Sequence, residues 1–188
     1  MRRLFEAAHH GPSVGFMQPW RFLVVRSLEL RRRIRDLVEE ERVRTADALG
    51  DRAAEFLRLK VEGIVECAEV VVVSMPEGRD RYVFGRRTIP DLDFASVGCA
   101  IRNLWLAACA EGLGVGWVSI FDPEALAELI RAPAGALPVA VLCIGPVSTF
   151  DSRPELERAG WDRRRHLDSI VDVDEWGRRF LSDVNDVQ

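Results

Sequence analysis

The 188-residue sequence has little of what would mark a membrane, secreted or nucleic-acid-binding protein. It contains no apolar run of about 18 residues, the length that a membrane-spanning helix needs. Its first ten residues, MRRLFEAAHH, do not form the apolar core of a secretory signal. The formal net charge is −4 and the pI is about 5.5, whereas nucleic-acid-binding domains are usually basic. We therefore expect a cytoplasmic protein with no membrane segment and no nucleic-acid partner.

Lysine and cysteine are also scarce. Lys60 is the single lysine among 26 lysine and arginine residues. We attribute this mainly to genome composition, although the planar guanidinium group of arginine also suits phosphate recognition. The four cysteines have no C-x-x-C spacing and sit among apolar neighbours. This pattern favours buried thiols in a reducing compartment over disulfides or zinc, and we expect no metal.

Helices and strands are interspersed along the chain without a strict βαβ order. Periodic apolar residues predict helices at residues 1–9, after Ser27, at about residues 51–68, from Ser96 to Gly112 and after Asp122. Short apolar runs predict strands at residues 20–25, 70–74, 114–120 and 138–144. The run at 70–74 is apolar throughout, which indicates burial on both faces. With 48% hydrophobic residues, this pattern predicts one layered α/β or α+β domain over residues 1–188.

The common catalytic motifs are absent: there is no G-x-S-x-G elbow, Walker loop or H-E-x-x-H helix. The segment GLGVG at residues 112–116 follows a predicted helix and opens a predicted strand, the reverse of a dinucleotide-binding fingerprint, so we interpret it as a tight turn. His9 and His10 are adjacent and point in different directions on a helix. We expect ordinary hydrogen bonds from them rather than a shared metal.

Two loops stand out. Residues 76–93 form a long polar stretch of the kind found in lids or disordered segments. Residues 11–20 combine glycine and proline with the polar Ser13 and Gln18 and the apolar Phe16 and Met17. These groups suit a planar heteroaromatic ligand that is apolar on its faces and polar at its edge. A purely structural loop is an equal alternative.

Four segments carry a resemblance to a known family. They are PSVGFMQPW, GRRTIPDLD, AIRNLWLAACAEGLGVGWVSIF and ELERAGW. In this order and spacing they resemble the BluB-type 5,6-dimethylbenzimidazole synthases of the nitroreductase-like flavoprotein superfamily. The Pro-Ser loop, Gln-Pro-Trp and the Gly-Leu-Gly turn are general to the superfamily, while GFMQPW and GWVSIF are particular to the synthases. The resemblance runs from Arg3 to about Trp176.

The resemblance implies a fold and an activity. The implied fold is α+β, with a central mainly antiparallel or mixed sheet flanked by helices, in a homodimer that binds flavin mononucleotide (FMN) in each of two sites at the subunit interface. The implied reaction consumes reduced FMN, supplied by a flavin reductase, together with O2. It releases 5,6-dimethylbenzimidazole, the lower ligand of cobalamin, and erythrose 4-phosphate. The protein then has to exclude water and place proton acceptors beside the flavin ring.

The resemblance also implies roles for single residues. The characteristic catalytic serine corresponds to Ser119 in GWVSIF, which from its sequence context alone would be an ordinary strand serine. Arg164, or failing that Arg163, corresponds to a phosphate contact, with a solvated arginine as the alternative. Lys60 would touch flavin oxygens or be a surface charge, and residues 86–94 correspond to a lid. The residues implied to bind the flavin are Ser13, Phe16, Met17, Gln18, Lys60, Phe94, Trp117, Val118, Ile120 and Arg164.

One expected motif is absent. Synthases of this type begin with a further segment containing Arg-Arg-Asp-Val-Arg, whose arginines bind the flavin phosphate and whose aspartate is the second characteristic catalytic residue. This sequence does not contain it, so a start codon assigned too late and a naturally shortened protein are both open. The leading hypothesis is the synthase activity. The alternatives are an NAD(P)H-dependent FMN nitroreductase-type oxidoreductase and a non-catalytic flavin-binding remnant.

Overall fold

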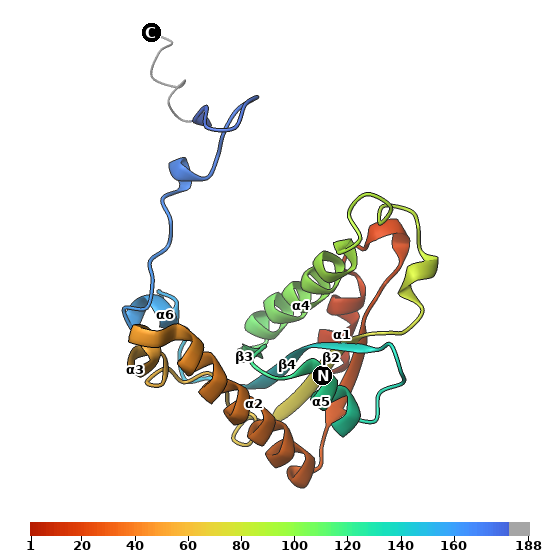
Figure 1. Ribbon diagram of the computed structural model, residues 1–188, viewed down its shortest axis with the longest axis vertical. Coiled ribbons are helices and arrows are strands. Elements are labelled where there is room, and N and C mark those ends of the chain that lie inside the picture. The colour runs from red at the N-terminus through yellow and green to blue at the C-terminus, as the bar shows by residue number, and fades with distance from the viewer. Residues whose placement is uncertain (181–188) are drawn as a thin grey trace. The chain divides into compact units, whose positions relative to one another are not determined.

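The computed structural model describes residues 1–180 and divides into two compact units, Met1–Phe150 and a second unit that begins at Asp151. The helices are α1 (Arg2–His9), α2 (Leu28–Leu49), α3 (Ala53–Phe56), α4 (Leu92–Ala110), α5 (Pro123–Leu129) and α6 (Glu155–Arg158). The strands are β1 (Arg21–Val25), β2 (Glu69–Met75), β3 (Leu113–Val118) and β4 (Leu137–Pro146) (Figure 1). Among residues 1–180, no helix has both the length and the apolarity that crossing a membrane requires. The single domain over residues 1–188 stays a prediction.

The four strands of the first unit form one sheet in the order β1-β2-β4-β3, and every neighbouring pair is antiparallel. In the centre, Val71 of β2 lies between Val24 of β1 and Leu142 of β4. This arrangement confirms the predicted α+β fold with a mainly antiparallel sheet.

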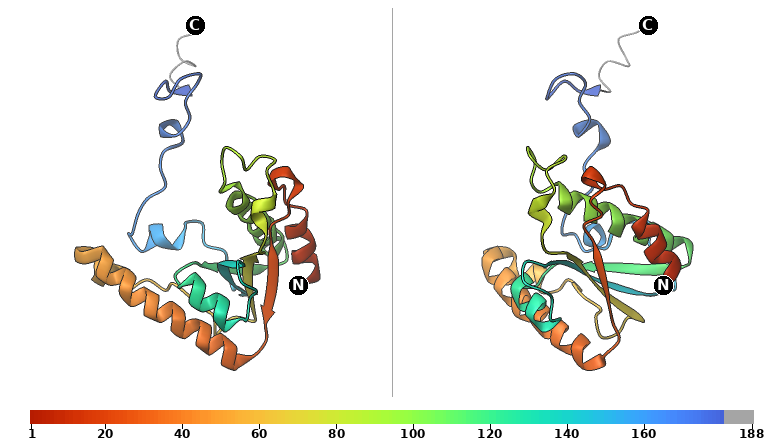
Figure 2. Two further views of the ribbon diagram at one scale, coloured as in Figure 1. Left: turned by 45° about the vertical axis from the view of Figure 1, so that its right-hand side comes forward. Right: turned by 90° about the vertical axis from the view of Figure 1, so that its right-hand side faces the viewer.

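Helices cover both faces of the sheet, α1 and α4 on one side and α2 and α5 on the other (Figure 2). Alternate residues of β2 therefore enter two separate cores. Val71 and Val73 pack with α1 and α4, whereas Val70 and Val72 pack with α2 and α5. All four valines are completely buried, which explains why the strand is apolar at every position.

The helix α4 is the main support of the first core. Ala100, Ile101 and Leu104 are completely buried, as the apolar spacing predicts. The helix begins at Leu92, four residues before the predicted start at Ser96. The extra turn forms because Asp93 is buried beneath the preceding loop, and one of its carboxylate oxygens accepts a hydrogen bond from the backbone N–H of Phe94 at 2.9 Å.

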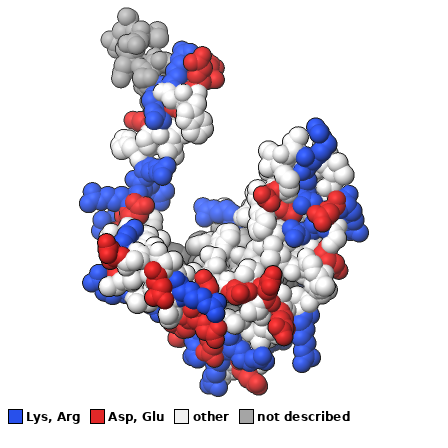
Figure 3. All heavy atoms as spheres, viewed as in Figure 1, with Lys and Arg blue, Asp and Glu red and all other residues white. Residues whose placement is uncertain are grey.

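The helix α2 shows how a highly charged segment still enters the core. Ser27 caps it by accepting a hydrogen bond from the Leu30 N–H at 3.2 Å. Ile34 and Val38 are completely buried against the sheet. Side chains of both signs lie interspersed over the outer surface of this region (Figure 3), as expected for a solvated helix face.

The predicted helix over residues 51–68 is wrong. Regular α-helix is limited to α3, and the chain from there to β2 is irregular. The guanidinium group of Arg42 donates hydrogen bonds to the carbonyl oxygens of Leu57 and Leu59 at 2.5 and 3.1 Å. The Glu62 carboxylate accepts from the Ile64 N–H at 2.6 Å. Side chains thus satisfy backbone groups that a longer helix would have paired internally.

Candidate active site

A small hollow lies where α4 passes the end of β3. Its volume is about 290 Å³, and three residues implied by the sequence, Phe94, Trp117 and Ser119, all line it. The other lining residues are apolar or glycine: Val97, Gly98, Phe121, Pro123, Leu137, Pro138 and Val139. Ser119 therefore supplies the one hydroxyl among the lining side chains, and the indole N–H of Trp117 is the other polar group.

The strand β3 directs Trp117 to this side of the sheet. Val115 packs in the α1 and α4 core, whereas Val118 packs in the α2 and α5 core, and side chains two residues apart share a face. Trp117 thus lies on the α4 side, where its side chain is 42% exposed. Val118 is buried on the opposite face and does not line the hollow.

Ser119 lies just beyond the strand. The predicted strand continues to residue 120, but β3 ends at Val118, where the pairing with Val141 of β4 ends. The chain then turns toward α5, whose cap Asp122 accepts hydrogen bonds from two backbone N–H groups at its start. Ser119 is exposed as a result, and Ile120 is half-buried outside the hollow.

The floor of the hollow contains a glycine in the middle of a helix. A Cβ atom added at Gly98 would meet no atom within 4 Å, because it would project into open space. Glycine costs about 1 kcal/mol relative to alanine in a helix interior. The open space beside Gly98 allows a flat ring to approach the α4 backbone closely.

The loop before β1 is fixed by hydrogen bonds. The Ser13 hydroxyl accepts from the Gln18 N–H at 3.0 Å, and the Ser96 hydroxyl of α4 accepts from the Val14 N–H at 3.0 Å. Phe16 and Gln18 both have a positive φ, 54° and 49°, a conformation uncommon for residues other than glycine. Phe16 is 84% exposed as a result. The strained loop thus presents an aromatic ring to its surroundings.

The long polar loop between β2 and α4 is anchored by a buried ion cluster. Asp93 is 1% exposed, and its carboxylate lies 2.8 Å from the Arg79 guanidinium and 3.3 Å from the Arg86 guanidinium. Arg86 also donates to the Arg79 carbonyl oxygen at 2.6 Å and to that of Pro90 at 2.9 Å. We call Arg79, Arg86 and Asp93 the loop clamp. It holds the loop against the first turn of α4, next to Phe94.

The clamped loop also touches the loop before β1. A Cβ atom at Gly15 would lie 2.8 Å from the Phe84 carbonyl oxygen, too close for any other residue. A Cβ atom at Gly85 would collide with the side chain of Val14. Both glycines have a positive φ, 52° and 80°, so glycine is required there for conformation and for space.

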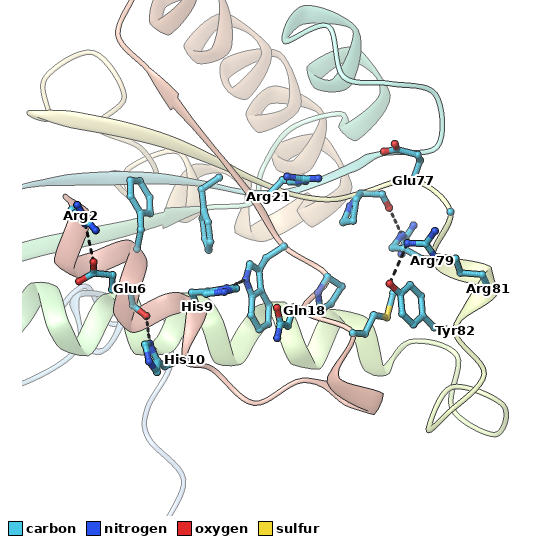
Figure 4. Close-up of a pocket in the computed structure, with 17 residues that line it drawn as sticks. Arg2, Glu6, His9, His10, Gln18, Arg21, Glu77, Arg79, Arg81 and Tyr82 are labelled. Carbon is cyan, nitrogen blue, oxygen red and sulfur yellow. Dashed lines mark hydrogen bonds and ion pairs between the residues drawn. The ribbon is translucent and has the colours of Figure 1, made fainter.

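A second, larger hollow of about 1090 Å³ lies beside α1 and β1 (Figure 4). Met17 and Gln18 line it, but no residue lines both hollows. Its wall is charged and aromatic, and includes Arg2, Phe5, Glu6, His9, His10, Trp20, Arg21, Phe22, Glu77, Arg79, Arg81 and Tyr82. Within one chain, five of the predicted site residues therefore fall into two separate groups, and the others line neither hollow: Ser13, Phe16, Lys60, Val118, Ile120 and Arg164.

The two adjacent histidines have different partners, as expected from the sequence. The Trp20 indole N–H donates to Nδ1 of His9 at 3.2 Å. Nδ1 of His10 lies 2.7 Å from the Glu6 carbonyl oxygen, so this nitrogen carries the proton. Figure 4 shows the two imidazoles directed apart.

The two basic residues predicted to touch the flavin lie outside both hollows. Lys60 is exposed in the irregular segment between α3 and β2. Arg164 is exposed in the second unit, as is Arg163. Their flavin contacts stay predictions.

The residues present fit the ring of a flavin better than they fit its phosphate. Phe94 and Trp117 offer apolar surface, Gly98 leaves room for a flat group, and Ser119 offers one hydrogen-bonding hydroxyl. No arginine or lysine lines the small hollow. Its volume is just below the usual range of about 300 to 1,000 Å³ for complete ligand pockets, so it has room for only part of a molecule as large as FMN.

Comparison with known proteins decides the family. The nitroreductase family profile matches residues 1–146. The chain belongs to the nitroreductase family. Its similarity to named oxidoreductases of this family also indicates an enzyme, and a flavoprotein fold.

Three proteins illustrate what the chain is similar to. The chain is 41% identical over 167 residues to a 5,6-dimethylbenzimidazole synthase of Rhodospirillum rubrum, which covers 87% of this chain and 78% of the relative. It matches the structure of iodotyrosine deiodinase bound to FMN and 3-iodo-L-tyrosine with a TM-score of 0.70 at 22% identity, covering 92% and 85% of the two chains. It matches a BluB-like flavoprotein from Clostridium difficile with a TM-score of 0.63 at 18% identity, covering 88% of each. The predicted resemblance is confirmed.

Sequence reasoning missed Gly98 and Asp93. A glycine inside the most regular helical pattern of the chain was a signal for Gly98, since it has no local reason to be there. Asp93 belongs to the polar stretch of residues 76–93, and nothing in the sequence distinguishes it from a solvated carboxylate. Its burial depends on two arginines, Arg79 and Arg86, that only the loop's path brings to it.

Proposed function

We propose that the protein is a 5,6-dimethylbenzimidazole synthase that consumes reduced FMN and O2 and releases 5,6-dimethylbenzimidazole and erythrose 4-phosphate. The observation that supports this proposal most directly is that a single hydroxyl, that of Ser119, lies in a hollow lined otherwise by aliphatic and aromatic residues and a glycine. The 41% identity to a protein named as this synthase supports the same reaction. In this proposal FMN is a substrate rather than a retained cofactor.

The chain's own residues have separate roles in this proposal. Bound reduced FMN supplies the electrons for oxygen reduction and the carbon atoms of the product. Phe94 and Trp117 cover the ring and exclude water, which strengthens electrostatic interactions in the hollow. Gly98 allows the ring to lie close to α4. The Ser119 hydroxyl accepts or donates a proton at the ring edge.

We further propose that the flavin lies between two copies of the chain in a homodimer. Ser13, Phe16, Met17 and Gln18 of one copy would complete the small hollow of the other. Two observations support this: the two groups share no cavity within one chain, and both Phe16 and Trp117 expose large aromatic surfaces. Lys60, Val118, Ile120 and Arg164 are proposed as additional flavin contacts, with Arg164 at the phosphate.

The remaining parts of the proposal concern the setting of the reaction. Residues 1–188 form one flavin-binding domain, and the protein works in the cytoplasm. A separate flavin reductase supplies reduced FMN.

The test is direct. Purified protein is mixed anaerobically with reduced FMN, exposed to air, and the products are separated by liquid chromatography with mass detection. We expect 5,6-dimethylbenzimidazole to appear as FMN disappears. Complete recovery of FMN without this product contradicts the proposal.

Membership of the nitroreductase family supports a second candidate, an NAD(P)H-dependent oxidoreductase that keeps FMN as a cofactor. A parallel reaction with FMN, NAD(P)H and a nitro or quinone acceptor distinguishes the two. Repeated bleaching and recovery of the flavin colour, with turnover of the acceptor and no loss of FMN, favours the oxidoreductase.

A further inference from the structure

Two cysteines lie together away from the candidate active site. Cys143 of β4 is 8% exposed in the α2 and α5 core, and the half-buried Cys67 packs against that core. Gly145, two residues beyond Cys143, has its side-chain position on the same face of β4. A Cβ atom at Gly145 would lie 3.4 Å from the Ala68 nitrogen and 4.0 Å from the Cys67 Cα. These are ordinary van der Waals distances, so the Cys67 segment runs directly against β4 near Cys143.

Hydrogen bonds fix the backbone of the Cys67 segment beside β4. The Arg31 guanidinium donates to the carbonyl oxygens of Cys67 at 2.8 Å, Ala68 at 3.1 Å and Val25 at 3.0 Å. The Cys67 thiol lies 3.2 Å from the Glu69 carbonyl oxygen. The Cys67 backbone is thus fixed to both α2 and the start of β2. The thiol pair is a positioned feature and not a chance contact of two mobile side chains.

The two sulfurs differ in reactivity because they interact. A hydrogen bond from Cys143 lowers the pKa of Cys67 to about 7, and the Ile144 N–H and the positive charge of Arg31 act in the same direction. The same hydrogen bond, together with burial, raises the pKa of Cys143. Near neutral pH, Cys67 is therefore the sulfur that loses its proton more readily, giving up the hydrogen bond that its thiol donates to the Glu69 carbonyl oxygen, and Cys143 is the protonated partner.

We propose that Cys67 and Cys143 form a peroxide-oxidisable dithiol, with Cys67 as the attacking sulfur and Cys143 as the resolving sulfur. The Cys67 thiolate attacks one oxygen of a hydroperoxide. The O–O bond breaks, and the leaving oxygen takes a proton to form water or an alcohol. Cys67 becomes a sulfenic acid. The peroxide is thereby reduced by two electrons.

The second step closes the disulfide. Oxidation removes the negative charge of Cys67 that kept the Cys143 proton in place. Cys143 then loses that proton and attacks the Cys67 sulfur, and the hydroxyl group leaves with the proton as water. One disulfide and two reduced oxygen atoms result. This chemistry is independent of the proposed flavin reaction.

The four cysteines can be followed separately. Cleavage after lysine and arginine, except before proline, places Cys67, Cys99, Cys109 and Cys143 on four different peptides, residues 61–79, 88–102, 103–131 and 132–158. Reduced full-length protein is treated with one equivalent of hydrogen peroxide at pH 7, the free thiols are alkylated, and the unreduced digest is analysed by mass spectrometry. We expect the main new species to be peptides 61–79 and 132–158 joined, with the loss of two hydrogens. Dithiothreitol should separate them.

Cys99 and Cys109, half-buried on α4, provide the matched control. The Cys99→Ser, Cys109→Ser double variant should form the link to the same extent as the unaltered chain. Cys143→Ser should abolish the link and leave a sulfenic acid on Cys67 that dimedone traps. Cys67 should react about threefold faster than an ordinary cysteine, since its larger thiolate fraction outweighs its lower intrinsic nucleophilicity.

The unaltered chain provides the decisive measurement, because it avoids any folding defect of a variant. Oxidation that reaches Cys99 or Cys109 before Cys67 overturns the proposal. So does a Cys67 that proceeds to sulfinic acid with no joined peptide.

Discussion

The two hollows of the first unit differ in size and in the chemistry of the residues that line them. The small hollow is apolar, has a single hydroxyl and is built on the helix α4 and the end of β3. The large hollow is charged and aromatic and is nearly four times as large. Both hollows are open to solvent, but the small one has the more apolar wall. In the proposed function, a ring bound there excludes water from the Ser119 hydroxyl, and the chemistry belongs to the small hollow.

The loop clamp links the two hollows. Arg79 lines the large one, and Asp93, its partner, directly precedes Phe94 in the small one. Breaking the clamp should therefore disturb both, whereas changes inside either hollow should stay local. The four predictions below use this difference.

The largest expected effect is that of Asp93→Ala. It leaves the guanidinium groups of Arg79 and Arg86 largely buried without their carboxylate, and removing one partner of a buried ion pair costs about 3 to 5 kcal/mol. Urea unfolding should show this loss. Glu6→Ala, which breaks the exposed pair with Arg2, should change the free energy of unfolding by less than about 1 kcal/mol. Equal losses in the free energy of unfolding for the two variants would show that the loop clamp stabilises the fold no more than an exposed ion pair does.

Ser119→Ala should affect the reaction and not the binding of its substrate. Removing a proton-transferring group typically lowers the rate by about a hundredfold or more, while one hydroxyl is a small part of the contact with a flavin. We expect product formation from reduced FMN to fall about a hundredfold and the Kd for FMN to change less than about twofold. Ser13→Ala, which removes a hydroxyl from the loop before β1, is the comparison. A parallel loss of rate and affinity in Ser119→Ala would assign a structural role to this serine.

Gly98→Leu should block the small hollow. The new side chain would fill the open space beside α4, while leucine is a better helix former than glycine. The Kd for FMN should rise at least about tenfold, as measured by fluorescence titration, with no loss of helix content or thermal stability. The control is Arg21→Ala in the large hollow, which should bind FMN normally. Normal binding by Gly98→Leu would place the flavin elsewhere.

The smallest effect is expected for Trp20→Phe in the large hollow. It removes the indole N–H that donates a hydrogen bond to His9, while keeping an aromatic ring. A hydrogen bond of this kind contributes about 1 kcal/mol, so the melting temperature should fall by a few degrees. Product formation per folded molecule should not change. A marked loss of activity would give the large hollow a part in the reaction.

Much of the fold follows from local patterns. The run of valines in β2 predicts a strand buried on both faces, and the apolar spacing of α4 predicts a long central helix, because both patterns reflect burial directly. The helix over residues 51–68 fails for the opposite reason. Its end is decided by Arg42, a residue on another helix that binds two of its carbonyl oxygens.

The sequence predicts members of a candidate site but not their arrangement. Resemblance to the synthases pointed to Ser119, Trp117 and Phe94, and the structure places all three around one hollow. Met17 and Gln18, implied by the same resemblance, line the other one. Spacing along the chain carries no information about which of two cavities a loop faces.

The sequence by itself determined the family, the α+β layering and the apolar positions that form the two cores, because each depends on residue types and their local period. Only the tertiary structure decided that Asp93 is buried between two arginines, that Gly98 opens a space in α4, and that Cys67 meets Cys143. Each of these features depends on the path of the folded chain around the residue and not on its immediate neighbours in the sequence. Their free energy depends on burial and on charges that only the folded backbone brings together.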